Sequence, residues 1–518
     1  MSVRKYVLLV SLLVLVLAVA LPAQAQRLVI ANIGDVVKLD PAYVTDVQSS
    51  TVSNQIHERL AVYDESGEPQ PALAVSWEAS EGGQVWTFYL REGVTFHDGT
   101  PFNAEAVKYT FERLRDPEMA SPGAGDISIV DTITVIDDFT VQFTLERPSA
   151  AFLSTSIMAT RSAIVSPAAA EEYGQDLSNH PVGTGPFKFV EWQPDSHVLL
   201  QANVDYWGGA PLLSEVMFKP IPEATTQLVE LETQGVDFIL RVGSTDFNRI
   251  QDNPDLQIFS TPDFNARYIF FQNQKFPFED KNIRYAVSHA IPVDDIVTAF
   301  LQNVAVRIHG VMPESSWAAH TPSKLFDYDV DKAKEYLAAS GWTETNSQGY
   351  LEQDGVELSV EIYTPDGRYP MDKEMATVIQ QSLGDIGIRG EIKVLEWGAY
   401  LAAVDDGEHQ LCILGWSQSS GEPATMYGPQ FKSHAIGGWA NAMFYHSDAV
   451  DALLLQGEEE TDMEARIAIY QEVQEIIAVD APMIPMYSEY LTYAAQNHVQ
   501  GYNHSPAGFD LTTVYLDK

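Results

Sequence analysis

Regular alternation of strand and helix patterns in the second half of the chain is the feature that most restricts its fold. From about Tyr268, a strand-like segment (YIFFQN) precedes two helical patterns. The order continues as strand LSVEIYT, helix MATVIQQSL, strand EIKVLEW, a short helix and strand LCILGW. Strands that alternate with helices form sheets covered by helices, so this half of the chain predicts an α/β lobe.

The first half of the chain is richer in hairpins and turns. Alternating residues in 84–91 and a hairpin over 132–146, with its turn at Asp137-Asp138, predict an inserted β-rich subdomain over residues 62–180. With 518 residues, the chain is too long for one ordinary core, so at least two lobes are expected. Helices are predicted over 103–114 (with Asn103 as the N-cap), 223–234, 282–290, 331–340, 373–383 and 464–478.

The first 25 residues have the pattern of an export signal. Arg4 and Lys5 precede an apolar run from Val7 to Leu21, and Ala23-Gln24-Ala25 matches a cleavage site. The run is short for a membrane-spanning helix, so a cleaved signal peptide is favoured over a retained anchor, and the mature chain is expected to begin at Gln26. Because no cysteine near this site could carry a lipid, we expect an unanchored periplasmic or secreted protein.

The single cysteine and the net charge narrow the classes of function. Cys412 lies in the apolar run LCIL, which predicts a small buried side chain in a strand rather than a nucleophile. A net charge of −42 repels nucleic acid and anionic lipid, which excludes both as partners.

Motifs for catalysis are missing from the sequence. It contains no G-x-S-x-G elbow, no H-E-x-x-H zinc motif and no P-loop. Gly183-Thr184-Gly185-Pro186 is interpreted as a turn into a strand, and His97-Asp98-Gly99 as a turn that closes a strand. The chain is therefore not expected to be an enzyme or to hold a cofactor. A secreted hydrolase, with a serine such as Ser419 as its nucleophile, stays as the alternative.

Several motifs occur in the same order as in a known family. They are YLREGVTFHDGTP at Tyr89–Pro101, PVGTGPF at Pro181–Phe187, NVDYWG at Asn203–Gly208 and KFPFEDKNIRYA at Lys275–Ala286. Together they cover essentially the whole mature chain. The sequence resembles the extracytoplasmic solute-binding proteins of peptide and nickel ABC transporters, family 5, and is similar above all to their glutathione- and dipeptide-binding branch.

This resemblance implies a two-lobed α/β periplasmic-binding-protein fold with a hinge. The two strand connections between the lobes are expected near Arg267–Gln272 and Ile484–Glu489. A monomer would capture its ligand in the interlobe cleft and deliver it to a membrane permease and ATPase. A role in presenting ligand to a chemosensor is left open. The expected boundaries are 26–61 and 181–267 for lobe I, 62–180 for the inserted subdomain, 268–486 for lobe II and 487–518 for the return to lobe I.

One arginine is the candidate anchor for a ligand carboxylate. The segment TPDGRYP (364–370) connects a strand to a helix and resembles the arginine-bearing loop of the family. A guanidinium offers two charge-assisted hydrogen bonds to a carboxylate, so Arg368 is the predicted anchor, with a solvated surface arginine as the alternative.

The expected partner of a ligand amine departs from the family pattern. Peptide binders that resemble this chain carry an aspartate where the segment GWSQSSGEP (415–423) has Ser419. Either Glu422, Asp46 or Glu396 takes over this role, or the ligand does not present an α-amine there. The GWSxSxGE pattern and the GRYPMDKE loop look closer to the glutathione-binding branch, so glutathione or another short peptide is the expected ligand.

The remaining candidates are aromatic, hydroxyl and histidine side chains. Trp416 and Trp439 are as suited to stacking on a ligand as to core packing, whereas core packing is favoured for Trp397. The other side chains that could line the cleft are Tyr43, Tyr427, Ser417, Ser419 and Ser420. Alternative solutes are a nickel chelate, an opine or an oligosaccharide, although His434 and His446 are weakly placed for nickel.

Overall fold

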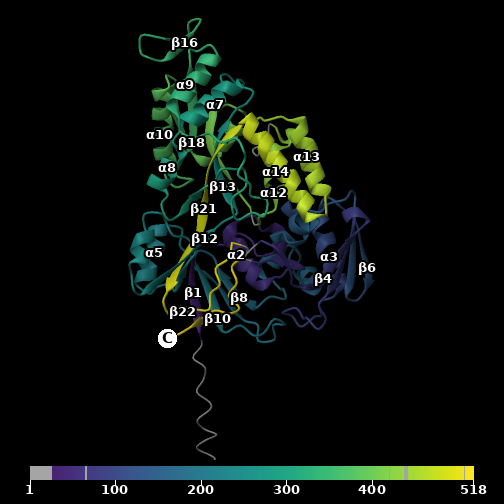
Figure 1. Ribbon diagram of the computed structural model, residues 1–518. Coiled ribbons are helices and arrows are strands. Elements are labelled where there is room, and N and C mark those ends of the chain that lie inside the picture. The colour runs from purple at the N-terminus through teal and green to yellow at the C-terminus, as the bar shows by residue number, and fades with distance from the viewer. Residues whose placement is uncertain (1–25, 65–66, 419, 437–440, 507) are drawn as a thin grey trace, which may run out of the picture.

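Two lobes stacked one above the other make up the molecule (Figure 1). The computed structural model describes residues 26–64, 67–418, 420–436, 441–506 and 508–518. The predicted signal peptide lies outside these ranges. No helix in the described part of the chain is long and apolar enough to cross a membrane.

The strands of lobe I form one half of a twelve-stranded sheet. Its first strand, β1, lies between β10 and β11 and runs parallel to both. Antiparallel pairs of β10 with β9 and of β9 with β8 extend the sheet to its edge. The bounds of these strands are β1 Arg27–Asn32, β8 Phe187–Gln193, β9 His197–Ala202, β10 Glu215–Pro220 and β11 Phe238–Ile239.

The other half of the sheet belongs to lobe II and confirms the predicted α/β alternation. Its strands are β13 Asn265–Phe271, β18 Ser359–Pro365, β19 Arg389–Leu395 and β20 Leu411–Ser417. Cys412 is buried within β20, as predicted. The helices of this half are α7 Lys281–Ala290, α8 Val293–Phe300, α9 Val330–Ala339, α10 Asp372–Asp385 and α11 Trp397–Asp405.

Two stretches of chain run through both lobes side by side. The longer strand, β21 (Met483–Gln496), pairs in its second half with β12 (Leu256–Pro262) and in its first half with β13. Strands β12 and β13 are separated only by Asp263 and Phe264, so they carry the chain from lobe I into lobe II while β21 carries it back. This pair of antiparallel crossings is visible at the centre of Figure 1.

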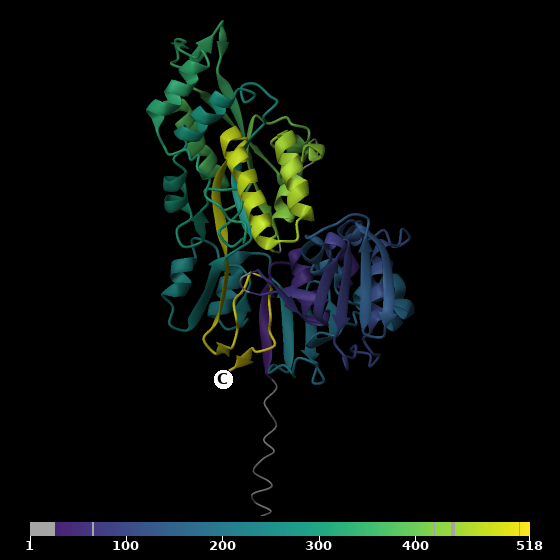
Figure 2. The ribbon, with the colours of Figure 1, turned by 45° about the vertical axis from the view of Figure 1, so that its right-hand side comes forward.

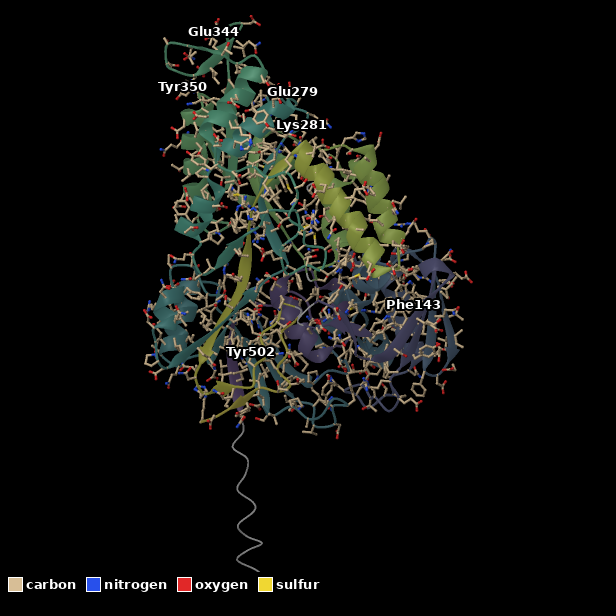
Figure 3. The ribbon with its side chains drawn as sticks, in the orientation of Figure 1. Phe143, Glu279, Lys281, Glu344, Tyr350 and Tyr502 are labelled. Carbon is tan, nitrogen blue, oxygen red and sulfur yellow. The ribbon has the colours of Figure 1, made fainter. Side chains whose placement is uncertain are left out.

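A separate β-rich unit lies beside lobe I. Its four strands are ordered β4-β5-β7-β6, with bounds Ala74–Ser80, Val85–Leu90, Thr140–Leu145 and Val130–Asp137. The helix α3 (Ala104–Arg115) begins after Asn103, whose Oδ1 accepts a hydrogen bond from Ala106 N at 3.0 Å, as expected of an N-cap. Phe143, labelled in Figure 3, packs edge-on against Phe111 at 4.9 Å in the core of this unit.

The GTGPF turn holds this unit against lobe I. His97 donates hydrogen bonds from its backbone N to Gly183 O and from Nε2 to Gly185 O, both at 2.9 Å. A Cβ atom on Gly183 would lie 2.1 Å from the carbonyl oxygen of Ile56, so only glycine fits. The turn predicted at His97-Asp98-Gly99 is present, because Phe96 N donates to Thr100 O across it.

Three helices of lobe II extend down to the inserted unit (Figure 2). They are α12 Pro423–Phe431, α13 Asp448–Glu459 and α14 Met463–Asp480. Ala150 N of the inserted unit donates to Glu458 O at 2.8 Å, and the guanidinium of Arg147 lies 3.6 Å from the Glu458 carboxylate. The two lobes are therefore in direct contact away from the crossing strands.

The remaining elements are short or peripheral. Tyr502, labelled in Figure 3, lies in the C-terminal segment and packs against Phe238 of lobe I at 5.0 Å. The other helices are α2 Val47–Ile56, α4 Pro167–Tyr173, α5 Ala224–Glu232 and α6 Phe247–Gln251. The other strands are β2 Ala61–Tyr63, β3 Pro69–Pro71, β14 Ala305–Arg307, β15 Glu344–Thr345, β16 Leu351–Gln353, β17 Val356–Glu357, β22 Val499–Gln500 and β23 Tyr515–Leu516.

Candidate ligand-binding cleft

The carboxyl ends of three parallel strands of lobe II lie at one edge of the sheet. β18 pairs in parallel with β19 and with β20, so the segments that follow these strands meet there. The last residue of β20, Ser417, pairs with Asn265, where the chain enters lobe II from lobe I. This edge therefore faces lobe I, and ligands of open α/β sheets bind beyond the carboxyl ends of their strands.

Arg368 lies in the segment that follows β18. Its backbone N donates to Asp372 Oδ2 at 2.9 Å, which fixes the loop against the start of α10, while the side chain is exposed. The guanidinium carbon lies 4.9 Å from the ring centroid of Trp397. Among the described residues, no carboxylate forms an ion pair with this guanidinium. Arg368 is thus a cation that rests on an aromatic face and keeps its hydrogen-bond donors for another group.

Trp397 supports Arg368 because the strand before it ends early. The sequence predicts a strand through EIKVLEW, but β19 stops at Leu395, and Glu396 caps helix α11 by accepting from Gly398 N at 2.9 Å. One side of the indole stacks on Tyr400 with ring centroids 5.7 Å apart. Trp397 therefore packs against the core, as favoured from the sequence, and its ring also contacts the guanidinium of Arg368.

Arg267 belongs to the same edge and was not singled out from the sequence. It is 8% exposed, and its Nη2 lies 2.8 Å from a carboxylate oxygen of Glu489 on β21. Its Nη1 donates to Trp416 O and to Ser417 Oγ, at 3.2 and 3.3 Å. This arginine ties β13, β20 and β21 together beside the candidate site. A charged residue within an otherwise buried strand was the signal that could have identified it.

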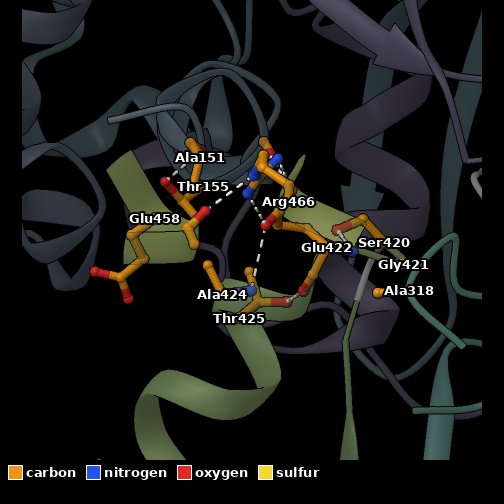
Figure 4. A network of polar contacts seen from close by, with 12 residues as sticks. Ala151, Thr155, Ala318, Ser420, Gly421, Glu422, Ala424, Thr425, Glu458 and Arg466 are labelled. Atoms are coloured by element: carbon orange, nitrogen blue, oxygen red, sulfur yellow. Dashed lines mark hydrogen bonds and ion pairs between the residues drawn. The ribbon is translucent and has the colours of Figure 1, made fainter. Parts of the chain in front are cut away.

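Glu422 is occupied by protein groups (Figure 4). Its Oε1 lies 2.7 Å from Nη2 of Arg466, and its Oε2 accepts from Ser154 Oγ at 3.0 Å. It also begins helix α12 by accepting from Ala424 N at 3.2 Å. The side chain is buried, and its negative charge is balanced by the neighbouring guanidinium of Arg466. This arrangement argues against a ligand amine at the Glu422 carboxylate.

The two other carboxylates considered for an amine serve as helix caps. Asp46 Oδ1 accepts from Ser49 N at 2.7 Å at the start of α2, and Glu396 caps α11. Each still has solvent-accessible surface, but neither is brought next to Arg368 by a contact among the described residues. Among these candidates, the structure thus leaves Arg368 as an exposed cation and shows no contact between it and Glu422, Asp46 or Glu396.

The last residues of β20 and the segment after it are only partly open to the solvent. Trp416 is half-buried, and its indole N–H donates to Thr425 O at 3.0 Å. Ser417 is exposed, whereas Ser420 is buried and accepts from Glu422 N at 3.3 Å. Ser419 and Trp439 lie outside the described residues.

Two tyrosines considered as cleft residues have structural contacts instead. Tyr43 donates its hydroxyl hydrogen to Met119 O at 2.6 Å and packs against the core of the inserted unit. Tyr427 is fully buried and stacks on Tyr470 with centroids 5.6 Å apart. Tyr427 is therefore a core residue, because its position on α12 points inward under α14.

Histidine ligands for nickel are not gathered in the cleft among the described residues. His446 lies on the surface of lobe II, with ligand atoms of Asp448 and Asp451 within 4.8 Å of its own. Asp451 already accepts a hydrogen bond from Ser433 N at 2.9 Å. His434 is exposed on a separate short helix.

Comparisons with known proteins agree on one family. Residues 68–438 match the model of the bacterial extracellular solute-binding proteins, family 5 Middle. A heme-binding protein A from Haemophilus influenzae is 30% identical over 91% of this chain and 88% of its own. A glutathione-binding protein from Escherichia coli is 28% identical over 92% of each chain.

Solved structures show the same two-lobed fold. The periplasmic binding protein DppA from Helicobacter pylori, in complex with the peptide STSA, is 32% identical. It superposes with a TM-score of 0.77 over 96% of this chain and 100% of its own. HbpA2 from Haemophilus parasuis is 27% identical and has a TM-score of 0.85, over 95% of this chain and 100% of its own.

The matches and the geometry agree with each other. The family consists of extracytoplasmic proteins that bind substrates for transport, and the chain is a substrate-binding component of an ABC importer for peptides or other solutes. Because the family model matches residues 68–438, well over half of its length, the chain belongs to the bacterial extracellular solute-binding proteins of family 5.

Proposed function

We propose that the chain captures a small peptide-like molecule with a free carboxylate in the cleft between its lobes and presents it to a membrane permease and its ATPase. The observation that carries this proposal is Arg368, which is exposed at the lobe II edge and rests on Trp397. A guanidinium held in this way is oriented before the ligand arrives, so less rotamer entropy is lost on binding.

None of the three carboxylates considered for an amine contacts Arg368 among the described residues, which favours a ligand whose amine is not in the α-peptide position. Glu422 is neutralised by Arg466, while Asp46 and Glu396 accept hydrogen bonds from helix N-termini. Glutathione, with its γ-linkage, places its amine differently from an α-linked tripeptide. Similarity to glutathione-binding proteins, together with dipeptide-binding relatives, supports this ligand class.

Isothermal titration calorimetry with three related ligands tests the proposal. Glutathione, the α-linked tripeptide Glu-Cys-Gly and glutathione amidated at its glycine carboxylate separate the two ends of the molecule. We expect glutathione to bind best and the amidated form to bind about tenfold to a hundredfold more weakly, because a charge-assisted hydrogen bond contributes about 1.5–3 kcal/mol.

Arg368→Ala should weaken glutathione binding to the same extent as the amidation does. Arg389→Ala is the matched control, since this half-buried arginine of lobe II pairs with Glu357 at 3.3 Å. An unchanged affinity in Arg368→Ala would reject the anchor, and failure of all short peptides to bind would reject the ligand class.

A further inference from the structure

One carboxylate lies where the chain crosses between the two lobes. Strand β21 pairs with β13 of lobe II up to Tyr487 and with β12 of lobe I from Tyr490 onward. Glu489 stands between these two positions, and its backbone N donates to Asn265 Oδ1 at 2.8 Å. Because Asn265 also pairs with the last residue of β20, Glu489 belongs to the edge of lobe II that faces lobe I.

A row of stacked side chains connects Glu489 to Arg368. Trp397, whose ring contacts the Arg368 guanidinium, meets the ring of Tyr369 edge-on with centroids 6.2 Å apart. The guanidinium carbon of Arg267 lies 4.8 Å from the centroid of the Tyr369 ring, and its Nη2 lies 2.8 Å from Glu489 Oε1. Burial raises the pKa of Tyr369, while Arg368 lowers it and Glu489 raises it, so both charges act on the same phenol. The two ends of this row therefore belong to one site.

Within the described part of the chain, Glu489 uses only one of its two carboxylate oxygens. Oε1 is buried next to Arg267, whereas the side chain as a whole is 25% exposed. Among the described residues, no group donates a hydrogen bond to Oε2, which is the accessible oxygen of this carboxylate. Glu422 differs, because both of its oxygens are bonded and its side chain is only 4% exposed.

Negative charge is in excess around Arg267. Burial alone would lower the pKa of Arg267, but Glu489 and, more weakly, Asp263 raise it above its usual value, so two carboxylates share one guanidinium. Both oxygens of Asp263 already accept hydrogen bonds from neighbouring residues, at 2.8 and 2.7 Å. The hydroxyl of Tyr487, on the same face of β21, is buried and bonds to none of the described residues, so it does not relieve the charge either. The accessible Oε2 of Glu489 is thus the point that favours a cation.

We infer that Glu489 binds the amine of the ligand through its Oε2. The inference rests on the proposed function: a carboxylate of the ligand bonds to Arg368, and its ammonium group bonds to Glu489 at the crossing between the lobes. A primary ammonium group gives this oxygen a charge-assisted hydrogen bond and offsets the excess negative charge. The amine then has an acidic partner although position 419 holds a serine.

Two ligands that differ only in the amine test the assignment. Glutaryl-Cys-Gly is glutathione without its amino group, and it keeps both carboxylates. Isothermal titration calorimetry on the mature protein should show that glutathione binds about tenfold to a hundredfold more tightly, the effect of one charge-assisted hydrogen bond. In Glu489→Gln, which keeps the volume and removes the charge, the two ligands should bind equally. The affinity of this variant for glutaryl-Cys-Gly should equal that of the parent protein, which shows that the site is still folded.

Glu357→Gln is the matched control. The side chain of Glu357 is also 25% exposed and lies 3.3 Å from an arginine, Arg389, but it belongs to a separate three-stranded sheet of lobe II. This variant should keep the preference for glutathione. A preference that persists in Glu489→Gln, or equal affinities in the parent protein, would overturn the inference and leave Arg368 and the ligand class intact. Failure of every short peptide to bind the parent protein would overturn the inference together with the proposed function.

Discussion

The Glu422 carboxylate lies 2.7 Å from Nη2 of Arg466, and the side chains of these residues are only 4% and 7% exposed. Breaking a buried pair leaves one charge uncompensated, which costs about 3–5 kcal/mol. We expect Glu422→Ala to lower the free energy of unfolding by this amount, measured by urea denaturation. If Glu422→Ala lowers the free energy of unfolding by less than 1 kcal/mol, the ion pair does not stabilise the fold.

A double substitution separates the charge effect from packing. Glu422→Gln with Arg466→Met removes both charges and keeps similar volumes, so it should cost less than Glu422→Ala alone. A cost equal to the sum of the single substitutions would show that the two side chains act independently.

Ser154 links the inserted unit to lobe II. Its Oγ donates to Glu422 Oε2 at 3.0 Å across the interface between the lobes. A hydrogen bond to a charged group contributes about 1.5–3 kcal/mol, so Ser154→Ala should weaken ligand binding about tenfold by favouring the open form. Small-angle scattering should show a larger radius of gyration at a fixed, subsaturating ligand concentration. Ser128→Ala is the control, since this hydroxyl bonds only within its own turn.

The Gly183 backbone leaves no space for a side chain. Since a Cβ atom would lie 2.1 Å from Ile56 O, the backbone of α2 or of the GTGPF turn must move in Gly183→Ala. We expect a loss of about 3 kcal/mol or more in unfolding free energy. Gly125→Ala, with no atom within 4 Å of the added Cβ, should remain close to the parent stability.

Buried histidines predict a loss of stability in acid. Burial lowers the pKa of His409 from 6.5 to about 4 and that of His57 to about 3. Because these folded-state pKa values lie below the ordinary value, the unfolded chain takes up protons first as the pH falls below about 6.5. Protonation of each histidine in the unfolded chain should therefore lower the free energy of unfolding by about 2 kcal/mol between pH 8 and pH 5.

His409→Gln isolates one of these contributions. The histidine Nε2 donates to Ala442 O at 2.8 Å, a bond that a glutamine amide can replace. Urea titrations at pH 8 and pH 5 should show a pH dependence smaller by about 2 kcal/mol in this variant. An unchanged difference between the two pH values would contradict the assignment.

Cys412 should be unreactive in the folded protein. Burial raises the pKa of its thiol to about 12, so almost no thiolate is present at neutral pH. A thiol reagent such as 5,5′-dithiobis-(2-nitrobenzoate) should modify the protein only in denaturant. Rapid modification without denaturant would show that β20 opens locally.

Much of the fold is readable from the sequence because local patterns and tertiary packing agree. The hairpin at Asp137-Asp138 and the helix after Asn103 combine turn or capping chemistry with a clear apolar face. The strand predicted through Trp397 ends instead at Leu395, because Glu396 caps a helix there. A single carboxylate that bonds to two backbone N–H groups outweighed the alternating pattern.

The candidate site was harder to predict because pairing partners are distant in sequence. Nothing near Glu422 indicates that Arg466, on another helix, neutralises it. Arg267 and Glu489 are likewise brought together only by the pairing of β13 with β21. Arg368 was selected on the composition of its loop and on the resemblance of that loop to the family, whereas its contact with Trp397, which follows a different strand, comes only from the folded structure.

The course of β21 has a consequence for how the protein is made. In lobe I, β11 pairs with β1 on one side and with β21 on the other, where Phe238 lies opposite Ala495. A nascent chain that stops before Met483 can form the helices of lobe II but cannot complete the sheet of lobe I. Pairing over such long sequence separations is slow. We therefore expect lobe I to stay incompletely folded until β21 has paired with β11, so that truncation before Met483 should destabilise the N-terminal lobe as well.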